Sequence, residues 1–116
     1  MPNITIYHNP RCSKSRKTLE LIRQHGDEPA IVEYLKTPPS PAGLKRILSL
    51  LNMAPRDLLR TKEKEYKEAG LDDPDLDDDA LIELMVANPK VIERPIVIVD
   101  GKATIGRPPE NVEKIL

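Results

Sequence analysis

The feature that most constrains the fold of this chain is a predicted β-hairpin near its C-terminal end. Residues 96–99 alternate Ile and Val, and this β-branched run is typical of a strand. The dipeptide Asp100-Gly101 that follows strongly favours a two-residue hairpin turn, and residues 102–106 supply the returning strand. The fold must therefore contain an antiparallel pair of strands, and purely helical architectures are excluded.

Two further strands are predicted in the first third of the chain. Residues 3–7 contain alternating side chains with the period of a strand. Residues 30–35 form a nearly continuous apolar run, which favours a strand covered on both faces. Helical spacing begins at Ser13, and Gly26 is a typical C-terminal cap. A strand, a helix and a strand in this order favour a parallel pair joined by a right-handed crossover.

The segment at about 40–89 contains only helical signals. Ser40 is a good N-cap and Pro41 suits the first position of a helix whose apolar residues recur at helical spacing. Further short helices are expected to begin at Pro55, at about residue 62, at Asp77 and after Pro108-Pro109. The chain is therefore predicted to be an α/β protein, with a four-stranded mixed sheet flanked by helices and an all-helical insertion at about 40–89.

Length and composition restrict the class of protein. The 116 residues suit a single domain over 1–116, and the core must be aliphatic because Phe and Trp are absent. A formal net charge of −1 gives no basic excess for nucleic acid, and no apolar run is long enough to cross a membrane. The N-terminal residues enter a strand pattern directly, so we expect no signal peptide. With a single cysteine and therefore no intrachain disulfide, we expect a soluble, cytoplasmic protein.

An acidic run at residues 72–79 contains six aspartates. We interpret it as a solvated loop followed by the start of a helix. Metal binding is the alternative, but the spacing matches no known ligand loop, and we expect no bound metal.

Cys12 is the main candidate for chemistry. A lone cysteine is often an inert buried residue, but Cys12 lies in a polar segment between the end of a strand and the start of a helix. Unpaired N–H groups at a helix N-terminus stabilise an anion. The hydroxyls of Ser13 and Ser15 and cations such as Arg16 are expected to add to this effect. We therefore predict a reactive thiolate with a pKa below that of a free cysteine.

Several classes of cysteine enzyme do not fit the residues around Cys12. A cysteine phosphatase needs an arginine at the sixth position after the cysteine, and that position is Thr18. A dithiol exchanger needs Cys-x-x-Cys, and the position is Ser15. A cysteine hydrolase needs a histidine base, for which His8 is the better placed of two histidines, without an obvious third member. Because no second cysteine can resolve an adduct on Cys12, the reductant must come from outside the chain.

Three arginines stand beside structural breaks in the sequence. Arg94 precedes Pro95 and a strand, Arg107 follows a strand end, and Arg60 ends a predicted helix. Guanidinium groups match oxyanions in geometry and charge, so these arginines are candidates to bind one next to Cys12. Ordinary surface salt bridges are the alternative for each of them. Pro95 could be a cis-proline, although its position alone does not establish this.

The chain resembles the glutaredoxin-coupled arsenate reductase family over essentially its whole length. The likeness rests on five separated motifs, which are residues 4–16, Tyr34 to Pro39, Leu58-Leu59-Arg60, Glu93 to Val97 and Gly106-Arg107-Pro108. The resemblance implies a thioredoxin-like fold with a helical insertion. It also implies that Cys12 attacks arsenate, that Arg60, Arg94 and Arg107 bind it, and that His8 helps to keep the cysteine ionised. Glutathione would be the co-substrate and glutaredoxin the protein partner, with no bound cofactor.

Two functional hypotheses follow. The first is an arsenate reductase that reduces arsenate to arsenite through a Cys12 adduct resolved by glutathione and glutaredoxin. The alternative is a thioredoxin-like regulatory or redox-sensing binding protein without arsenate turnover.

Overall fold

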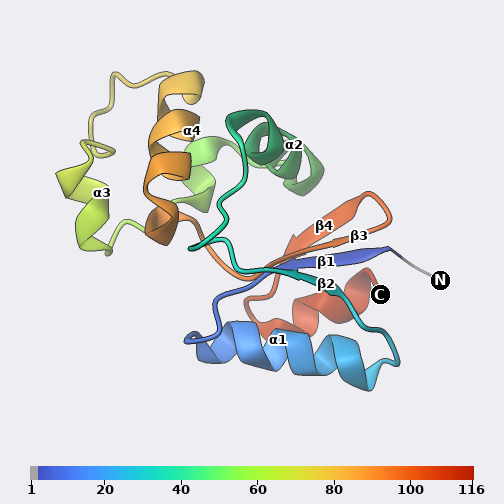
Figure 1. Ribbon diagram of the computed structural model, residues 1–116. Helices are drawn as coiled ribbons and strands as arrows, with labels where there is room; N and C mark the ends of the chain where they lie inside the picture. The colour runs from blue at the N-terminus through green and yellow to red at the C-terminus, as the bar shows by residue number, and fades with distance from the viewer. Residues whose placement is uncertain (1–2) are drawn as a thin grey trace. The chain divides into compact units, whose positions relative to one another are not determined.

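A four-stranded mixed sheet forms the centre of one of the two compact units into which the chain divides. The computed structural model describes residues 3–116. The strands are ordered β2-β1-β3-β4, with β1 and β2 parallel and the other two pairs antiparallel (Figure 1). The elements of this unit are β1 (Ile4–Tyr7), α1 (Ser13–Gln24), β2 (Ala30–Val32), β3 (Ile96–Val99), β4 (Lys102–Ile105) and the 3-10 helix η3 (Pro109–Lys114). The predicted four-stranded mixed sheet and its C-terminal hairpin are confirmed.

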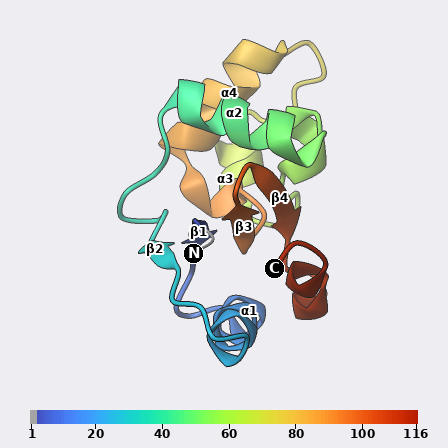
Figure 2. The same ribbon diagram turned by 90° about the vertical axis from the view of Figure 1, so that its right-hand side faces the viewer.

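The core of this unit lies between one face of the sheet and two helices. In the antiparallel register Ile4 pairs with Val99 and Ile6 with Val97, so these four side chains share a face. They pack with buried residues of α1 and with Val112 of η3. Figures 1 and 2 show α1 and η3 on the same side of the sheet. Aliphatic burial on this face therefore fixes the strand register, since a slip by one residue would turn every apolar side chain outward.

The hairpin between β3 and β4 has the predicted turn. Asp100 and Gly101 have φ values of 48° and 84°, and positive φ at both central residues is the requirement of a type I′ turn. The Asp100 carboxylate also accepts a hydrogen bond from the Asn3 N–H at 2.8 Å. The dipeptide Asp100-Gly101 therefore determines both the position and the type of this turn.

The prediction for the second strand was wrong in length and in environment. The strand covers Ala30–Val32 only, lies at the sheet edge, and leaves Ile31 42% exposed. After it the chain turns, and the Glu33 carbonyl accepts hydrogen bonds from the N–H groups of Lys36 and Thr37. A short apolar run can belong to a strand or to a turn that packs its side chains against the core. The periodicity of the sequence could not distinguish these two structures.

The second unit, residues 38–93, is built from short helices. Ser40 accepts a hydrogen bond from the Gly43 N–H at 3.0 Å and Asp77 accepts one from Ala80 at 2.8 Å, so both predicted N-caps are confirmed. Its core is aliphatic, with residues such as Leu44 and Met85 fully buried. The elements are α2 (Pro41–Leu51), η1 (Pro55–Leu58), α3 (Lys64–Glu68), α4 (Asp78–Ala87) and η2 (Pro89–Val91). These elements lie between Pro41 and Val91. The organisation of 1–116 as one domain with a helical insertion at about 40–89 stays a prediction.

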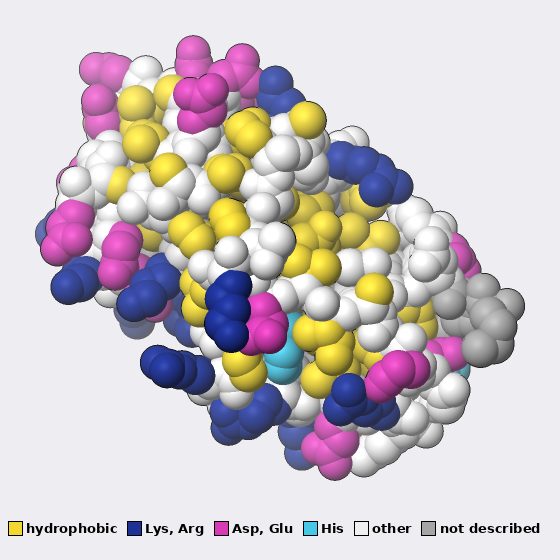
Figure 3. All heavy atoms as spheres, viewed as in Figure 1, with side chains coloured by type: hydrophobic (Ala, Val, Ile, Leu, Met, Phe, Trp, Pro, Cys, Tyr) yellow, Lys and Arg dark blue, Asp and Glu magenta, His cyan; other side chains and the backbone are white. Residues whose placement is uncertain are grey.

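The acidic run gathers over the loop before α4 and over the start of that helix (Figure 3). Several of its aspartates have local structural partners: Asp73 accepts a hydrogen bond from the Asp75 N–H, Asp77 caps α4, and Asp79 pairs with Lys45 at 2.7 Å. Within residues 3–116, no group of His, Cys, Asp and Glu is arranged to hold a metal ion.

None of the helices in the described part of the chain combines the length and the apolar character needed to cross a membrane.

Gly106, directly after β4, allows a close approach of backbone to α1. A Cβ atom at this position would collide with Thr18 Oγ1 and lie 2.8 Å from Pro95 Cγ. We predict that Gly106→Ala lowers the free energy of unfolding by about 1–3 kcal/mol through overpacking, measured by urea denaturation. Gly101→Ala is a comparison variant without a packing cost, because its Cβ meets nothing within 4 Å and its expected loss of about 1–2 kcal/mol comes from the positive φ alone. A loss below about 0.5 kcal/mol in Gly106→Ala would contradict the packing argument.

Candidate active site around Cys12

A tight turn after β1 delivers the cysteine to the start of α1. The Cys12 N–H donates to the Asn9 carbonyl at 3.0 Å, and the Arg11 N–H donates to Asn9 Oδ1 at 3.0 Å. Asn at the first position of a turn and Pro10 at the second are the residues that such a turn favours. The Asn-Pro pair therefore ends the strand and sets the direction in which α1 begins.

Cys12 occupies the N-cap of α1. Its backbone is extended, with φ −91° and ψ 123°, and its carbonyl accepts the Arg16 N–H at 3.0 Å. An N-cap side chain is usually a Ser, Thr, Asp or Asn that accepts from the first-turn N–H groups. The sulfur makes no short capping hydrogen bond, but the N–H groups of Ser15 and Lys14 both lower its pKa. With no acidic residue in the first turn, this helix end favours an ionised sulfur.

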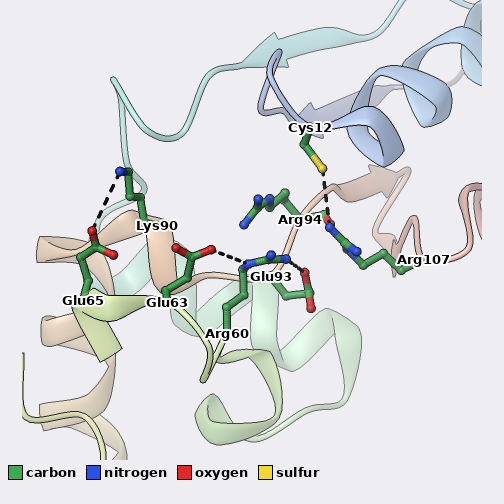
Figure 4. A network of polar contacts seen from close by, with 8 residues as sticks. All are labelled: Cys12, Arg60, Glu63, Glu65, Lys90, Glu93, Arg94 and Arg107. Carbon is green, nitrogen blue, oxygen red and sulfur yellow. Dashed lines mark hydrogen bonds and ion pairs between the residues drawn. The ribbon is translucent and has the colours of Figure 1, made fainter. Parts of the chain in front are cut away.

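Two arginines from the other end of the chain lie beside this sulfur. Because β3 runs antiparallel to both β1 and β4, the residues after β1, before β3 and after β4 meet at one end of the sheet. Arg107 Nη2 donates to Cys12 Sγ at 3.5 Å, and Arg107 Nε donates to the Arg94 carbonyl at 2.7 Å. Figure 4 shows Arg107 reaching toward the sulfur with Arg94 alongside. The fold thus places two of the three predicted substrate arginines next to Cys12.

The pKa of Cys12 reflects opposing effects. Partial burial of the thiol is the largest of them and raises the pKa. The N–H of Ser15, a hydrogen bond from the Arg94 side chain, the N–H of Lys14 and the charge of Arg94 act in the other direction and together outweigh burial. The pKa is lowered below its ordinary value, as expected for a reactive cysteine at a helix N-terminus.

Hydrogen bonds of Gly106 and Asn111 hold Arg107 in place, and Asn111 was not singled out in the sequence analysis. Gly106 N–H donates to the Pro95 carbonyl at 2.9 Å, and Asn111 Nδ2 donates to the Arg107 carbonyl at 3.0 Å. The Thr18 hydroxyl donates to the Lys14 carbonyl at 2.8 Å and lies 3.5 Å from the Gly106 carbonyl. A glycine directly before an arginine at a strand end was the available signal for this close approach.

Both arginines precede a cis-proline. The Arg94–Pro95 bond is cis, as considered from its position in the sequence, and the Arg107–Pro108 bond is also cis, which the sequence analysis did not anticipate.

Of the three residues expected to stabilise the thiolate, Ser15 acts through a different group from the one anticipated, and the roles of Ser13 and Arg16 stay predictions. The hydroxyl of Ser15 was expected to donate to the sulfur, but it lies 2.6 Å from His8 Nδ1 and accepts the Asn9 N–H at 3.0 Å. Ser15 acts on the sulfur through its backbone N–H instead. Arg16 Nη1 donates to the Pro10 carbonyl at 2.9 Å. Ser13 is exposed at the first position of α1.

His8 is buried at the end of β1, and its pKa is lowered. Burial is the main cause, Glu33 raises the pKa, and the charges of Arg23 and Arg16 lower it. An imidazole with a pKa below its ordinary value of about 6.5 is mostly neutral at pH 7.

Arg60 belongs to the second unit and has carboxylates as partners. Its guanidinium lies 2.7 Å from Glu93 and 3.4 Å from Glu63 (Figure 4). Burial alone would lower the pKa of Arg60, but the two carboxylates raise it above its ordinary value. The role of Arg60 in binding a substrate stays a prediction.

The site geometry makes the reactivity of Cys12 testable through its pH dependence. We predict that iodoacetamide alkylates Cys12 with an apparent pKa below that of a free thiol. Arg94→Ala should raise this apparent pKa, because it removes a hydrogen bond and a positive charge from the sulfur, and Arg107→Ala should raise it as well. Arg46→Ala, at an exposed position of α2, is the control and should leave the profile unchanged. A wild-type profile equal to that of free cysteine would contradict the assignment.

The lowered pKa of Cys12 also links ionisation to stability. A group whose pKa is lower in the folded state contributes stability above its unfolded pKa and loses it as pH falls through the folded pKa. The wild type should therefore gain free energy of unfolding relative to Cys12→Ser as pH rises from 5 toward about 9. Urea denaturation of both proteins across this range measures the difference. Parallel stability curves would show that the sulfur is not stabilised as an anion.

Comparison with known proteins identifies the family of the chain. Residues 7–115 match the model of the ArsC family. The uncharacterized protein YfgD of Escherichia coli is 54% identical over 97% of this chain and 96% of its own length. An arsenate reductase of Neisseria meningitidis is 50% identical over the full length of both chains. A solved structure of an arsenate reductase from Vibrio cholerae superimposes with a TM-score of 0.95 at 50% identity, over 98% of each chain. With a motif set, a fold and a family model in agreement, the chain belongs to the ArsC family, whose fold is thioredoxin-like.

Proposed function

We propose that this protein is an arsenate reductase that uses Cys12 as its nucleophile. The observation that carries the proposal is the sulfur at the N-cap of α1, with a lowered pKa and Arg107 Nη2 3.5 Å away. An anionic nucleophile beside guanidinium groups is an arrangement suited to an anionic substrate. The Neisseria meningitidis and Vibrio cholerae relatives, both called arsenate reductases, support the same assignment.

The first chemical step is attack of the Cys12 thiolate on arsenic. One arsenic–sulfur bond forms and one arsenic–oxygen bond breaks, and the oxygen leaves as water after taking up protons. Arsenic stays pentavalent in this adduct. Reduction to arsenite needs two electrons, which are released when two thiol sulfurs become a disulfide.

The arginines have two tasks in this reaction. They bind the oxyanion in a forked geometry, and they offset the repulsion between a doubly charged substrate and the thiolate. Arg94 and Arg107, which belong to the same compact unit as Cys12, are proposed to do this, since Arg107 contacts the sulfur directly and the side chain of Arg94 lowers its pKa. We propose Arg60 as a third ligand on the ground of the motif in which it lies.

The second thiol must come from outside the chain, because Cys12 is the only cysteine. We propose glutathione as the co-substrate: its sulfur bonds to Cys12 Sγ, the arsenic–sulfur bond breaks with its electron pair left on arsenic, and trivalent arsenite is released. Glutaredoxin is proposed as the protein that then reduces the mixed disulfide between Cys12 and glutathione. No bound cofactor is required by this sequence of steps. A cytoplasmic location would supply the reduced glutathione, and neither nucleic acid nor a membrane has a role in the reaction.

The assay for this function is arsenite formation from arsenate in the presence of glutathione and glutaredoxin. We predict turnover by the wild type and none by Cys12→Ser, because the serine hydroxyl is far less acidic than the cysteine thiol and stays protonated. Arg94→Ala and Arg107→Ala should each reduce kcat/KM by about 10²–10³-fold, the usual cost of removing one donor to developing negative charge. Arg46→Ala should retain activity, since this exposed arginine lies on α2.

Two outcomes would contradict the proposal. Normal turnover by the arginine variants would mean that the oxyanion is bound elsewhere. Absence of turnover in the wild type, together with glutathionylation of Cys12 and capture of a protein partner, would favour the redox-sensing alternative. Omission of glutathione or glutaredoxin separately tests the identity of the reductant.

A further inference from the structure

A pocket opens between the first turns of α1 and the start of η3. It has a volume of about 280 Å³ and is lined by Ser13, Lys14, Lys17, Pro109 and Glu110. All five residues belong to the same compact unit as the cysteine, and α1 packs against η3 within it. Neither the cysteine nor the arginines proposed to bind the substrate line this pocket, so the proposed reaction leaves it without a role.

This pocket lies directly beside the reactive sulfur. Ser13 follows Cys12 in the chain, and their Cα atoms are about 3.8 Å apart, as across any trans peptide bond. On the other wall, Pro109 comes two residues after Arg107, whose Nη2 donates to Cys12 Sγ at 3.5 Å (Figure 4). The two walls therefore continue from residues that meet at the sulfur, and a small molecule bound between them would be within reach of Cys12.

The charged groups that line the pocket are not paired with one another or with other described residues. Lys14 and Lys17 are exposed and lie one turn apart on the same side of α1, and Glu110 is exposed on η3. None of the three takes part in a salt bridge within residues 3–116. Two cations and one carboxylate are therefore available to a ligand.

A larger pocket of the same unit, of about 570 Å³ along α1, offers fewer available charges. Its two arginines already have partners within the chain. Arg23 Nε lies 2.7 Å from a Glu28 oxygen, and Arg16 Nη1 donates to the Pro10 carbonyl at 2.9 Å. The residues that line it include none from the segment after β4, which provides the guanidinium at the sulfur. The pocket between α1 and η3 is therefore the better candidate for a charged ligand that reacts at the cysteine.

We propose that the pocket between α1 and η3 binds glutathione, with Lys14 and Lys17 holding its two carboxylates and Glu110 holding its ammonium group. This inference rests on the proposed function, which needs a thiol from outside the chain, and it says where that thiol is held. The charges of glutathione complement those of two lysines and one glutamate. Its thiol belongs to the central residue of the tripeptide, so a molecule held at both ends keeps its sulfur close to the neighbouring Cys12.

The experiment measures how fast Cys12 of the full chain reacts with glutathione disulfide, without arsenate or glutaredoxin. The thiolate attacks one sulfur of the reagent, a disulfide between Cys12 and glutathione forms, and the second glutathione leaves as a thiolate that takes up a proton. Each rate constant is divided by the rate constant with hydroxyethyl disulfide, a reagent without charges. This ratio cancels differences in the pKa or exposure of the thiol, so it reports the recognition of glutathione.

Lys14→Gln and Lys17→Gln should each lower this ratio by about two- to fivefold, the effect of losing one exposed ion pair. The double variant should lower it by about four- to twentyfold, because the two lysines are proposed to hold different carboxylates. Arg11→Gln is the matched control, since it removes an exposed positive charge next to Cys12 that does not line the pocket, and it should leave the ratio unchanged. An equal fall in Arg11→Gln would show a general attraction between cations and an anionic reagent, and would overturn the site.

Glu110→Gln distinguishes a binding site from such an attraction by the sign of its effect. If Glu110 holds the ammonium group, the variant lowers the ratio by about two- to fivefold. If the region only attracts an anion through its net charge, the loss of a negative charge raises the ratio. A raised or unchanged ratio would overturn the proposed site. All of the substituted residues are exposed, so the variants should keep the urea midpoint of the wild type, which is measured alongside.

These outcomes are separate from the test of arsenate reduction. A protein whose ratios change as expected but which forms no arsenite would contradict the proposed function and support the glutathione pocket. A protein that forms arsenite while its lysine variants keep the ratio of the wild type would support the function and overturn the pocket.

Discussion

The antiparallel pairing of β3 with β1 and β4 is the constraint on which the site depends. Tyr7 pairs with Ile96, and Ile96 pairs with Ile105. The segments that follow Tyr7, precede Ile96 and follow Ile105 therefore emerge together at one end of the sheet, although the first comes from the N-terminal part of the chain and the other two from the C-terminal part. The nucleophile comes from the first of these segments and the two arginines from the others. Apolar burial on the α1 face keeps this register, so the core determines the geometry of the site.

The sulfur gains its charge from fixed donors placed around a partly buried atom. Burial alone would favour the neutral thiol, and it does raise the pKa. The same burial strengthens each hydrogen bond and charge interaction by excluding water, so that backbone N–H groups and Arg94 outweigh it together. A fully exposed cysteine would lose this gain, and a fully buried one could not reach a substrate. An N-cap position satisfies both needs, because it faces solvent while the helix N–H groups point at it.

Local signals in the sequence predicted those parts of the fold that local interactions control. The Asp100-Gly101 turn, the Ser40 and Asp77 caps and the helix after Cys12 all depend on neighbours within a few residues. The edge position of β2 and the shared bond between Ser15 and His8 depend on tertiary contacts. The convergence of Arg94 and Arg107 on Cys12 was a hypothesis from their positions beside structural breaks, and the motif resemblance strengthened it. Strand order would have predicted it once the pairing was known. Asn9 is a typical turn residue, but no local feature of the sequence indicated that its N–H would donate a hydrogen bond to Ser15 Oγ.

A site charged by fixed dipoles has a consequence for the proposed reaction. When the sulfur bonds to arsenic it loses its negative charge, whereas the N–H groups and guanidinium groups that stabilised it stay in place. The negative charge now lies on the oxygens of the adduct, close to the same donors. The interactions that lowered the pKa of Cys12 are then available to the adduct and to the transition state that leads to it, which is the condition for catalysis by differential binding.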